Sequence, residues 1–269
     1  MSEAAVSMLW MLARPELDWV EVGEGMRATV DTPDDGRASL TLELTAAAAA
    51  SLGALPELGS RTRVGVMFGI LAHTLFDGHI SAREVADDGS VVLQATDLLA
   101  ELDEKHTSAE GTLLQQVRAV LAAWEVPLRV DELLIDESLP GIEREPGESD
   151  GAWLTRACAA SGLSILRQQG TLQLSNRLRI GPLAMERTAM PAIRPADCTQ
   201  ERRFSPVAGV RVAEIDLPAT TRLRGLVRGV MALEGFGADD GAYYTQHIVH
   251  RLQAQTYDQS LTLVRLGAA

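Results

Sequence analysis

The stretch that decides the fold is Arg61–Asp97, which reads RTRVGVMFGILAHTLFDGHISAREVADDGSVVLQATD. It contains three largely apolar runs, Arg63–Gly69, Leu75–Ile80 and Val91–Thr96, and the turn sequence Asp87-Asp88-Gly89 precedes the last of them. Runs of this length bounded by Gly and Asp predict strands and hairpins. No phosphate-binding glycine loop, paired metal ligands or nucleophile elbow interrupts the stretch, so we expect a structural scaffold.

The composition is that of a globular protein. The chain has 269 residues, 46% of them apolar, 23% charged and 4% aromatic, which allows one large domain or two to three small ones. No apolar run reaches membrane-spanning length, and Glu3 stands where a signal peptide is basic, so we expect folding in a cytoplasm without stable membrane insertion. Cys158 and Cys198 are expected to be unpaired thiols.

The formal net charge of −13 disfavours ordinary nucleic-acid binding, because duplex affinity comes largely from Lys and Arg that neutralise phosphates. A surface that lets DNA pass without binding would also be acidic. Charge alone favours a soluble acidic exterior, since it bears on solubility and association rather than on fold.

Three blocks follow one another along the chain. Residues 1–100 are expected to be mostly strands, with one helix over Ala46–Leu52 that Thr45 caps. Residues 101–180 are expected to be a helical block with a terminal hairpin, and residues 181–269 are again strand-rich. The predicted fold class is α+β, mainly β, with two small β-barrel domains flanking a helical insertion.

In the middle block, Thr112 is expected to cap one helix and Asp150 a second, which Gly162 ends. A strand, turn and strand over Leu163–Arg167 and Thr171–Leu174 follow. After a linker over residues 182–195, four strands are predicted over Val207–Ile215, Arg222–Leu233, Ala242–Leu252 and Tyr257–Leu266.

The histidines are weak candidates for a metal site. On a strand, a spacing of three places His247 and His250 on opposite faces, whereas metal ligands must converge. His73 and His79 share a face only if one strand runs through both. Since no Cys or carboxylate stands at ligand spacing, we expect ordinary strand or loop histidines.

No residue is assigned a catalytic, cofactor-binding or metal-binding role. Three acidic clusters stand beside Gly or Pro: Asp87-Asp88, Asp239-Asp240 and Glu143-Arg144-Glu145. Asp favours turns because it binds its own backbone, so we interpret these clusters as turns. Cys158 and Cys198 lie in no reactive motif, and Trp153-Leu154 is expected to be core.

Several motifs resemble those of one family. The sequence of residues 149–163, SDGAWLTRACAASGL, is similar to the element "polar cap, Trp/Phe-Leu, helix, Gly-Leu, strand, Gly, strand" of phage baseplate hub proteins. Leu75-Phe-Asp-Gly-His-Ile80 and the following hairpin resemble the first barrel of that family, and residues 246–263 resemble its terminal strand pair, with Asp258-Gln259-Ser260 where Thr is more usual. The family includes the phage late control D proteins and the hub part of type VI secretion spikes.

The resemblance, which spans about residues 15–266, implies a structural protein rather than an enzyme. In that family two barrels per chain are tube domains, and a homotrimer joins the sixfold tail tube to the threefold spike in the virion baseplate. The implied partners are the tail tube protein, the central spike protein and other baseplate proteins, with no cofactor, and DNA passes through the lumen without specific binding. We expect a carboxylate-rich lumen, with Glu43, Glu84, Asp87 and Asp88 as candidates, and residues 109–175 outside the ring, with Arg118 and Arg156 away from the channel.

Three alternatives stay open. The first is the hub of a contractile injection or type VI-like secretion system. The second is a β-rich hydrolase, which predicts a pocket with convergent titratable groups of perturbed pKa. The third is a carbohydrate-binding module, which predicts exposed aromatic side chains in a groove, with Tyr243, Tyr244, Tyr257 and Phe236 as candidates. We also expect residues 15–100 and 183–266 to form two similar barrels, and a merger into one sheet would count against the hub resemblance.

Overall fold

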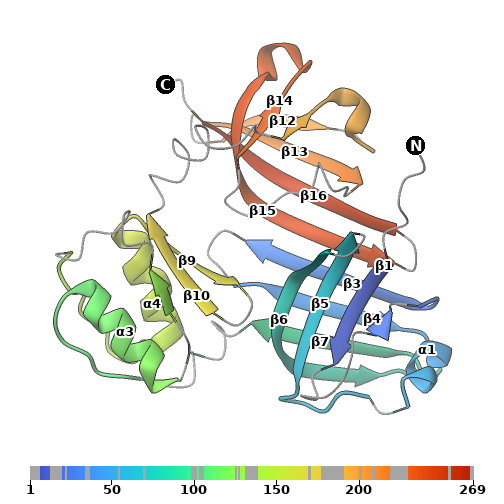
Figure 1. Cartoon of the computed structure of the whole chain (residues 1–269), viewed down its shortest axis with the longest axis horizontal. Coiled ribbons are helices and arrows are strands. Elements are labelled where there is room, and N and C mark those ends of the chain that lie inside the picture. The colour runs from blue at the N-terminus through green and yellow to red at the C-terminus, as the bar shows by residue number, and fades with distance from the viewer. Residues whose placement is uncertain are drawn as a thin grey trace. The chain divides into compact units, whose positions relative to one another are not determined.

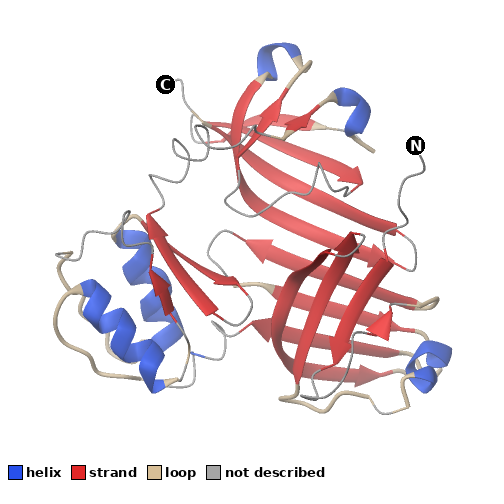
Figure 2. Ribbon diagram, in the orientation of Figure 1, coloured by secondary structure: helices blue, strands red, loops and turns tan. Residues whose placement is uncertain are grey.

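The computed structural model describes residues 7–12, 20–21, 23–33, 37–53, 55–68, 71–97, 102, 106–124, 126, 128–130, 139–168, 171–176, 191–199, 202–207, 210–218, 230–253 and 256–266. The chain divides into two compact units (Figure 1). The first, here the β unit, comprises Met1–Asp34, Ala38–Asp97 and Arg187–Ala269. The second, here the helical unit, comprises Asp35–Arg37 and Leu98–Glu186. Strands dominate the described residues (Figure 2), so the predicted α+β, mainly β class is confirmed.

The first part of the β unit has seven strands and one short helix: β1 Ser7–Leu12, β2 Val20–Glu21, β3 Met26–Pro33, β4 Ser39–Leu44, α1 Ala46–Ser51, β5 Arg61–Phe68, β6 Leu71–Val85 and β7 Val91–Asp97. Buried and exposed residues alternate in β4 and β7, as expected for strands with one face on a core. Thr45 caps α1, because its Oγ1 accepts a hydrogen bond from the Ala48 N–H at 3.3 Å. The predicted helix and its cap are confirmed.

The long strand β6 folds the sheet around its first core. Its first part pairs with β5 and its second part with β7, and the register shifts once in each pairing. Such shifts bend a strand and increase its twist. Figure 1 shows β5 and β6 lying over β3, β4 and β7, and Val64, Val66 and Phe76 share one hydrophobic cluster with Leu42 and Leu93.

The last part of the β unit has its own core. Its elements are β11 Ala192–Ile193, the 3-10 turn Pro195–Asp197, β12 Arg203–Val207, β13 Val210–Pro218, β14 Val230–Leu233, the 3-10 turn Gly237–Asp239, β15 Gly241–Gln253 and β16 Thr256–Arg265. Ile215, Leu233, Tyr243, Leu261 and Leu263 are almost fully buried in this cluster. The strands predicted to end the chain are confirmed as β15 and β16.

The two strand-rich blocks belong to one hydrogen-bonded sheet. Its strand order is β12-β13-β16-β15-β3-β4-β7-β6-β5-β1-β2, and the link between the blocks is the antiparallel pair β3 and β15. Leu252 of β15 and Tyr257 of β16 lie in the first core, although both strands also contribute to the second. The expectation that the blocks form separate sheets is therefore wrong, because β3 and β15 satisfy each other's backbone groups.

The helical unit packs two helices on a small sheet. Its elements are α3 Leu113–Ala123, β8 Leu128–Val130, α4 Asp150–Ala160, β9 Leu163–Gln168 and β10 Thr171–Asn176, and the sheet order is β8-β10-β9. A third core, which includes Leu113, Val117, Trp153, Leu154 and Cys158, lies between them. Thr112 and Gln115 form a capping box at the start of α3, as the sequence predicted a cap there.

Three expectations about elements change. Ser149, not Asp150, is the N-cap of α4, and its Oγ accepts a hydrogen bond from Ala152 N–H at 3.1 Å. The strand predicted over Val207–Ile215 is interrupted, because the chain reverses between Val207 and Val210, which pair with each other. Residues 182–190 of the predicted linker and 222–229 of a predicted strand lie outside the described residues.

Candidate functional site

The feature of the β unit with the clearest functional character is the non-core face of its sheet. Seven strands contribute to this face: β12, β13, β16, β15, β3, β4 and β7. In each of them, the side chains on this face alternate along the strand with the side chains that point into a core. We call it the polar face. It consists mainly of Ser, Thr, Gln and charged residues: Arg27, Thr29, Asp31, Ser39, Thr41, Glu43, Gln94, Thr96, Arg203, Ser205, Glu214, Asp216, His247, Arg251, Gln253, Thr256, Asp258, Ser260 and Thr262. Valines 92, 207, 210, 212, 249 and 264 also lie on it.

Carboxylates outnumber guanidinium groups on the polar face. The carboxylates are Asp31, Glu43, Glu214, Asp216 and Asp258, and the guanidinium groups are Arg27, Arg203 and Arg251. Glu84 of β6 lies opposite Val92 in register and adds a further carboxylate at the edge of the face. The β3 and β15 pair makes the face continuous across both strand-rich blocks.

Hydrogen bonds tie neighbouring strands together across the polar face. Ser260 of β16 donates to Asp216 Oδ1 of β13 and accepts from Arg251 Nη1 of β15 at 2.6 Å. His247 Nε2 lies 2.5 Å from Asp31 Oδ1, and this contact crosses the link between the two blocks. A depression of about 700 Å³ opens on this part of the face, lined in part by Arg203, Glu214, Asp216, His247 and Ser260.

The histidines do not converge. His247 faces Asp31 on the polar face, whereas His250 is buried and its Nδ1 lies 2.8 Å from the Tyr257 hydroxyl. The prediction that these two lie on opposite faces is confirmed. β6 does run through positions 73 and 79, but the register of its pairing shifts between Val64 and Gly65, so the six-residue spacing does not imply a shared face. Among the described residues, no three His, Cys, Asp or Glu side chains could hold a metal ion.

The acidic clusters make structural contacts. In the turn before β7, Asp88 Oδ1 accepts hydrogen bonds from the Ser90 hydroxyl at 2.6 Å and the Ser90 N–H at 2.9 Å, and these bonds hold the pKa of Asp88 below its ordinary value. Asp239 binds Arg211 Nε at 2.6 Å, and Asp240 accepts from the Phe236 N–H at 2.5 Å. The turn interpretation is confirmed for Asp88 and Asp240.

In the Glu143-Arg144-Glu145 cluster both glutamates are exposed, but Arg144 contacts a buried carboxylate of the helical unit. Asp150 is fully buried and accepts hydrogen bonds from the Thr107 N–H and hydroxyl, both at 2.7 Å, and from Trp124 Nε1 at 2.9 Å. Arg144 pairs with the same carboxylate. Burial pushes the pKa of Asp150 upward, but these bonds and the arginine outweigh burial, so the pKa lies below its ordinary value.

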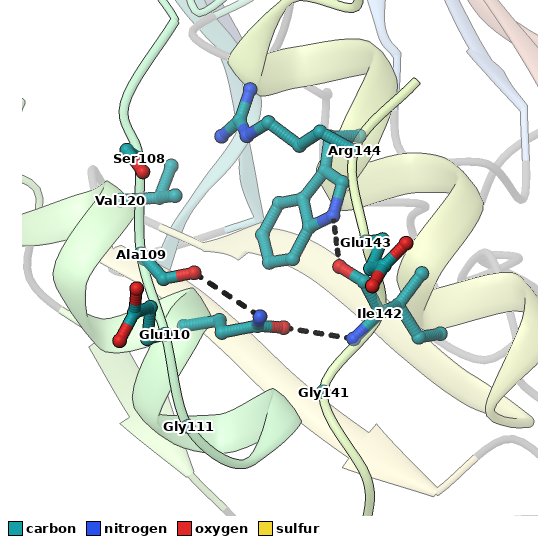
Figure 3. A pocket seen from close by; sticks show the side chains of 11 residues that line it. Ser108, Ala109, Glu110, Gly111, Val120, Gly141, Ile142, Glu143 and Arg144 are labelled. Carbon is teal, nitrogen blue, oxygen red and sulfur yellow. Dashed lines mark hydrogen bonds between the residues drawn. The ribbon is translucent and has the colours of Figure 1, made fainter. Parts of the chain in front are cut away.

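Two loops of the helical unit border a depression of about 530 Å³ (Figure 3). Gln116 joins them: its Nε2 donates to the Ala109 carbonyl at 3.2 Å, and its Oε1 accepts from the Ile142 N–H at 2.9 Å. Trp153 Nε1 donates to the Ile142 carbonyl at 3.0 Å, and the Arg144 guanidinium lies 5.0 Å from the centre of the Trp153 ring. Each of these polar side chains therefore has a structural partner.

The remaining candidates also occupy structural positions. Cys158 is buried in the core of the helical unit, and Cys198 is partly buried. Burial raises the pKa of the Cys198 thiol. Tyr243 and Tyr257 are buried in two different cores, so they do not form the exposed groove that a carbohydrate site would need. No helix in the described part of the chain is long and apolar enough to cross a membrane.

The sequence identified polar residues of this face without showing that they share it. Glu43 and Glu84, two of the expected lumen carboxylates, do lie on it, whereas Asp87 and Asp88 lie in the exposed turn between β6 and β7. The alternation of polar and apolar residues over Ser39–Leu44 indicates that one side of this strand is polar. Only the pairing of β3 with β15 joins the polar sides of the two strand-rich blocks into one face.

Comparison with solved structures shows what this architecture resembles. The 43 kDa tail protein of prophage MuSo2 from Shewanella oneidensis has a TM-score of 0.72 and 12% identity, with 97% of this chain and 98% of that chain covered. A tail protein from Neisseria meningitidis MC58 has a TM-score of 0.73 and 11% identity, with 97% of each chain covered. The fold is that of solved phage tail proteins. The hub resemblance seen in the sequence is confirmed at the level of fold.

A third similar structure is the E. coli c3393 protein, described as a type VI secretion component with structural similarity to the T4 tail proteins gp27 and gp5. Its TM-score is 0.60 at 8% identity, with 91% of this chain and 74% of that chain covered. No family model matches the sequence, and no curated protein matches it. This chain has the fold of the tail protein although its two β blocks form one continuous sheet. The merger of the blocks is therefore compatible with the resemblance.

Proposed function

We propose that this protein is a structural component of a phage tail baseplate. In the finer form of the proposal it is a hub, three copies of which form a ring that joins the sixfold tail tube to the threefold spike. The tail tube protein, the central spike protein and other baseplate proteins are its partners. The proposal is supported by the tail-protein fold over nearly the whole chain. A structural rather than enzymatic role goes with this assignment.

The observation that carries the proposal is the continuous polar face. A conduit for DNA needs a wall with few fixed cations, because Lys and Arg that neutralise phosphates give salt-dependent affinity for a duplex. The polar face offers hydroxyl and amide groups with an excess of carboxylates, and it extends unbroken over seven strands. We propose that this face lines the lumen, so that DNA passes along it without specific binding.

The division into domains fits the same proposal. We propose that residues 1–100 and 181–269 supply two tube domains, each with its own core, and that residues 101–180 form an insertion outside the ring. Arg118 is exposed on α3, and Arg156 is bound to Glu148 at 2.6 Å, so neither cation is assigned to the channel wall. Edge strands of the continuous sheet would meet between copies.

A cryo-electron microscopy map of assembled tails tests the proposal. We expect three copies around an axial channel, with the polar face towards the axis. A particle that lacks this protein, or one that contains a single copy, contradicts the hub role. A lumen lined by the opposite face or by Lys and Arg contradicts the conduit mechanism while leaving the tail assignment intact.

A charge test addresses the conduit separately. Thr41 of β4 and Gln94 of β7 lie opposite each other on the polar face. In the Thr41→Lys/Gln94→Lys variant we expect assembled tails that eject DNA more slowly, with partial recovery at high salt. The matched control is Ala47→Lys/Ala119→Lys, which adds the same two charges at exposed positions on α1 and α3, outside the face. Equal ejection by both variants would mean that DNA does not pass along this face.

One second candidate has a specific observation behind it. The likeness to the E. coli type VI secretion component supports a hub in a contractile injection or secretion system. We favour the phage assignment because the phage tail proteins match with higher TM-scores and over a larger share of their own length. Detection of the protein in purified phage particles, rather than in a secretion apparatus, would decide between the two.

A further inference from the structure

The non-core face of β5 and β6 carries a cluster of charged side chains. On the core side, Val64 of β5 and Phe76 of β6 lie directly opposite each other in the first core. Arg63 and Asp77, the adjacent register pair, point to the other side, because side chains alternate along a strand. Arg61 stands two residues before Arg63 and lies on the same side. We call Arg61, Arg63 and Asp77 the arginine cluster.

Asp77 lies at the centre of the arginine cluster, and only 4% of its side chain is exposed. Arg61 donates from Nε to Asp77 Oδ1 at 2.9 Å and from Nη2 to Oδ2 at 2.8 Å, which is a bidentate pair. Arg63 Nε lies 3.2 Å from the same Oδ2. Two guanidinium groups, which stay charged in proteins, therefore share one carboxylate, so one positive charge is not balanced within the cluster.

Arg63 is the member of the cluster that lacks acceptors. Its Nε is buried, and it has no hydrogen-bond acceptor within the described part of the chain. The side chain is nevertheless 28% exposed, so it remains open to a ligand. A guanidinium has five N–H donors, and a buried donor without an acceptor costs free energy. An anionic oxygen group bound from outside would supply both the acceptor and the balancing charge.

The composition of the site favours a single carboxylate of a protein. The planar guanidinium group matches both carboxylate and phosphate. Nucleic acid is bound through several cations that neutralise successive phosphates, whereas this cluster has one unbalanced charge in a chain of net charge −13. Met11 of β1 is the register partner of Arg63 on its other side, and Arg and Met are both enriched in protein interfaces.

The arginine cluster lies on the side of the β unit that faces away from the polar face. The first core lies between β5 and β6 on one side and β4 and β7 on the other, and residues of all four strands contribute to it (Figure 1). β6 passes from one side to the other near its register shift between Ile80 and Ala82. With the polar face towards the lumen, the cluster is directed towards the surrounding baseplate proteins rather than towards DNA.

We propose that the arginine cluster binds an Asp or Glu side chain of a different baseplate protein and that Arg63 makes the contact. Asp77 is a positioning residue, because it holds both guanidinium groups in place without touching the partner. Such a fixed site loses little conformational entropy on binding. The inference rests on the proposed function and adds to it a docking site outside the channel, distinct from the edge contacts proposed between copies.

One test compares tails assembled with wild-type protein, with Arg63→Gln and with Arg83→Gln. Arg83 is an exposed residue of the same strand, so its variant removes the same charge outside the cluster. We expect assembled tails to fall about tenfold or more with Arg63→Gln, because the partner carboxylate loses its cation, and to stay near the wild-type number with Arg83→Gln. Asp77 keeps its bidentate partner Arg61 in Arg63→Gln, and the unfolding midpoint of each purified variant reports whether it is folded.

A second test uses the wild type alone and does not depend on a variant that folds. In a cryo-electron microscopy map of assembled tails, the group next to the Arg63 guanidinium is expected to be an Asp or Glu carboxylate of another protein. A phosphate, a second copy of this chain or bulk solvent at that place overturns the inference and leaves the hub assignment intact. Wild-type assembly by folded Arg63→Gln also overturns it, because the contact then contributes no binding. A particle that lacks this protein overturns the proposed function and the inference together.

Discussion

At the scale of single residues, the structure shows why a glycine, Gly78, stands within the Leu75–Ile80 motif. A Cβ at this position would lie 2.1 Å from the Thr96 carbonyl oxygen and 2.6 Å from Phe76 Cζ, both inside van der Waals contact. Phe76 belongs to the first core and is almost fully buried. The glycine therefore permits β6 to approach β7 while the phenylalanine fills the core.

Gly78→Ala is expected to destabilise the β unit by about 1–3 kcal/mol, because the added methyl group overpacks the contact with Thr96. Chemical denaturation with fluorescence detection measures the change. The control is Gly23→Ala, since no atom lies within 4 Å of a Cβ built at Gly23. Equal stabilities for the two variants would show that the close approach to Thr96 is not energetically important.

Asp150 is the second residue whose environment makes a sharp prediction. Its folded-state pKa lies below the value of an unfolded aspartate, about 3.9. The carboxylate therefore contributes stability at pH values above about 4, and that contribution is lost as the pH falls through the lower folded-state pKa. The helical unit should accordingly lose stability in acid.

Asp150→Asn is expected to destabilise the helical unit by about 3 kcal/mol, because the partly buried Arg144 loses its charged partner. The variant should also flatten the dependence of unfolding on acid pH, which a pH series of denaturation curves measures. Asp88→Asn is the control, since that carboxylate has a lowered pKa but is exposed in a turn. An unchanged acid profile in Asp150→Asn would contradict the role assigned to Asp150.

At the scale of elements, the helices depend on their caps. The side chain of Thr112 accepts a hydrogen bond from the Gln115 N–H at 3.4 Å, and Gln115 Oε1 accepts from the Thr112 N–H at 2.9 Å. Thr112→Ala is expected to cost about 1 kcal/mol in the stability of the helical unit. Arg118→Ala on the exposed side of the same helix should cost much less. Hydrogen exchange at the first turn of α3 would locate the loss, and uniform exchange would refute it.

At the scale of the whole molecule, β15 and β16 couple the two cores of the β unit. Leu252 is fully buried in the first core, while Ile248 of the same strand lies in the second. Leu252→Ala is expected to destabilise by about 2–5 kcal/mol through a cavity. Because the sheet is continuous, faster hydrogen exchange should appear in both β4 and β13. Loss of protection in β4 alone would show that the two halves unfold independently.

Much of the local structure was readable from the sequence. Thr45 before five alanines predicts α1, and the spacing of apolar residues after Thr112 predicts α3, because caps and periodicity act over one or two turns. The turn at Asp88 and the strands β15 and β16 follow from equally local patterns. The hairpin at Val207 was missed, because the strand predicted from Val207 to Ile215 ran through the position where the chain reverses.

The sequence by itself determined the mainly β class and local elements such as α1, α3, β15 and β16, since each depends on local residue chemistry. Only the tertiary structure decided that β3 pairs with β15 and that Asp31 therefore meets His247. It also decided that Glu43 and Asp216 share one face. Strand pairing between residues about two hundred positions apart is selected by edge hydrogen bonding and core packing, and no local pattern encodes it.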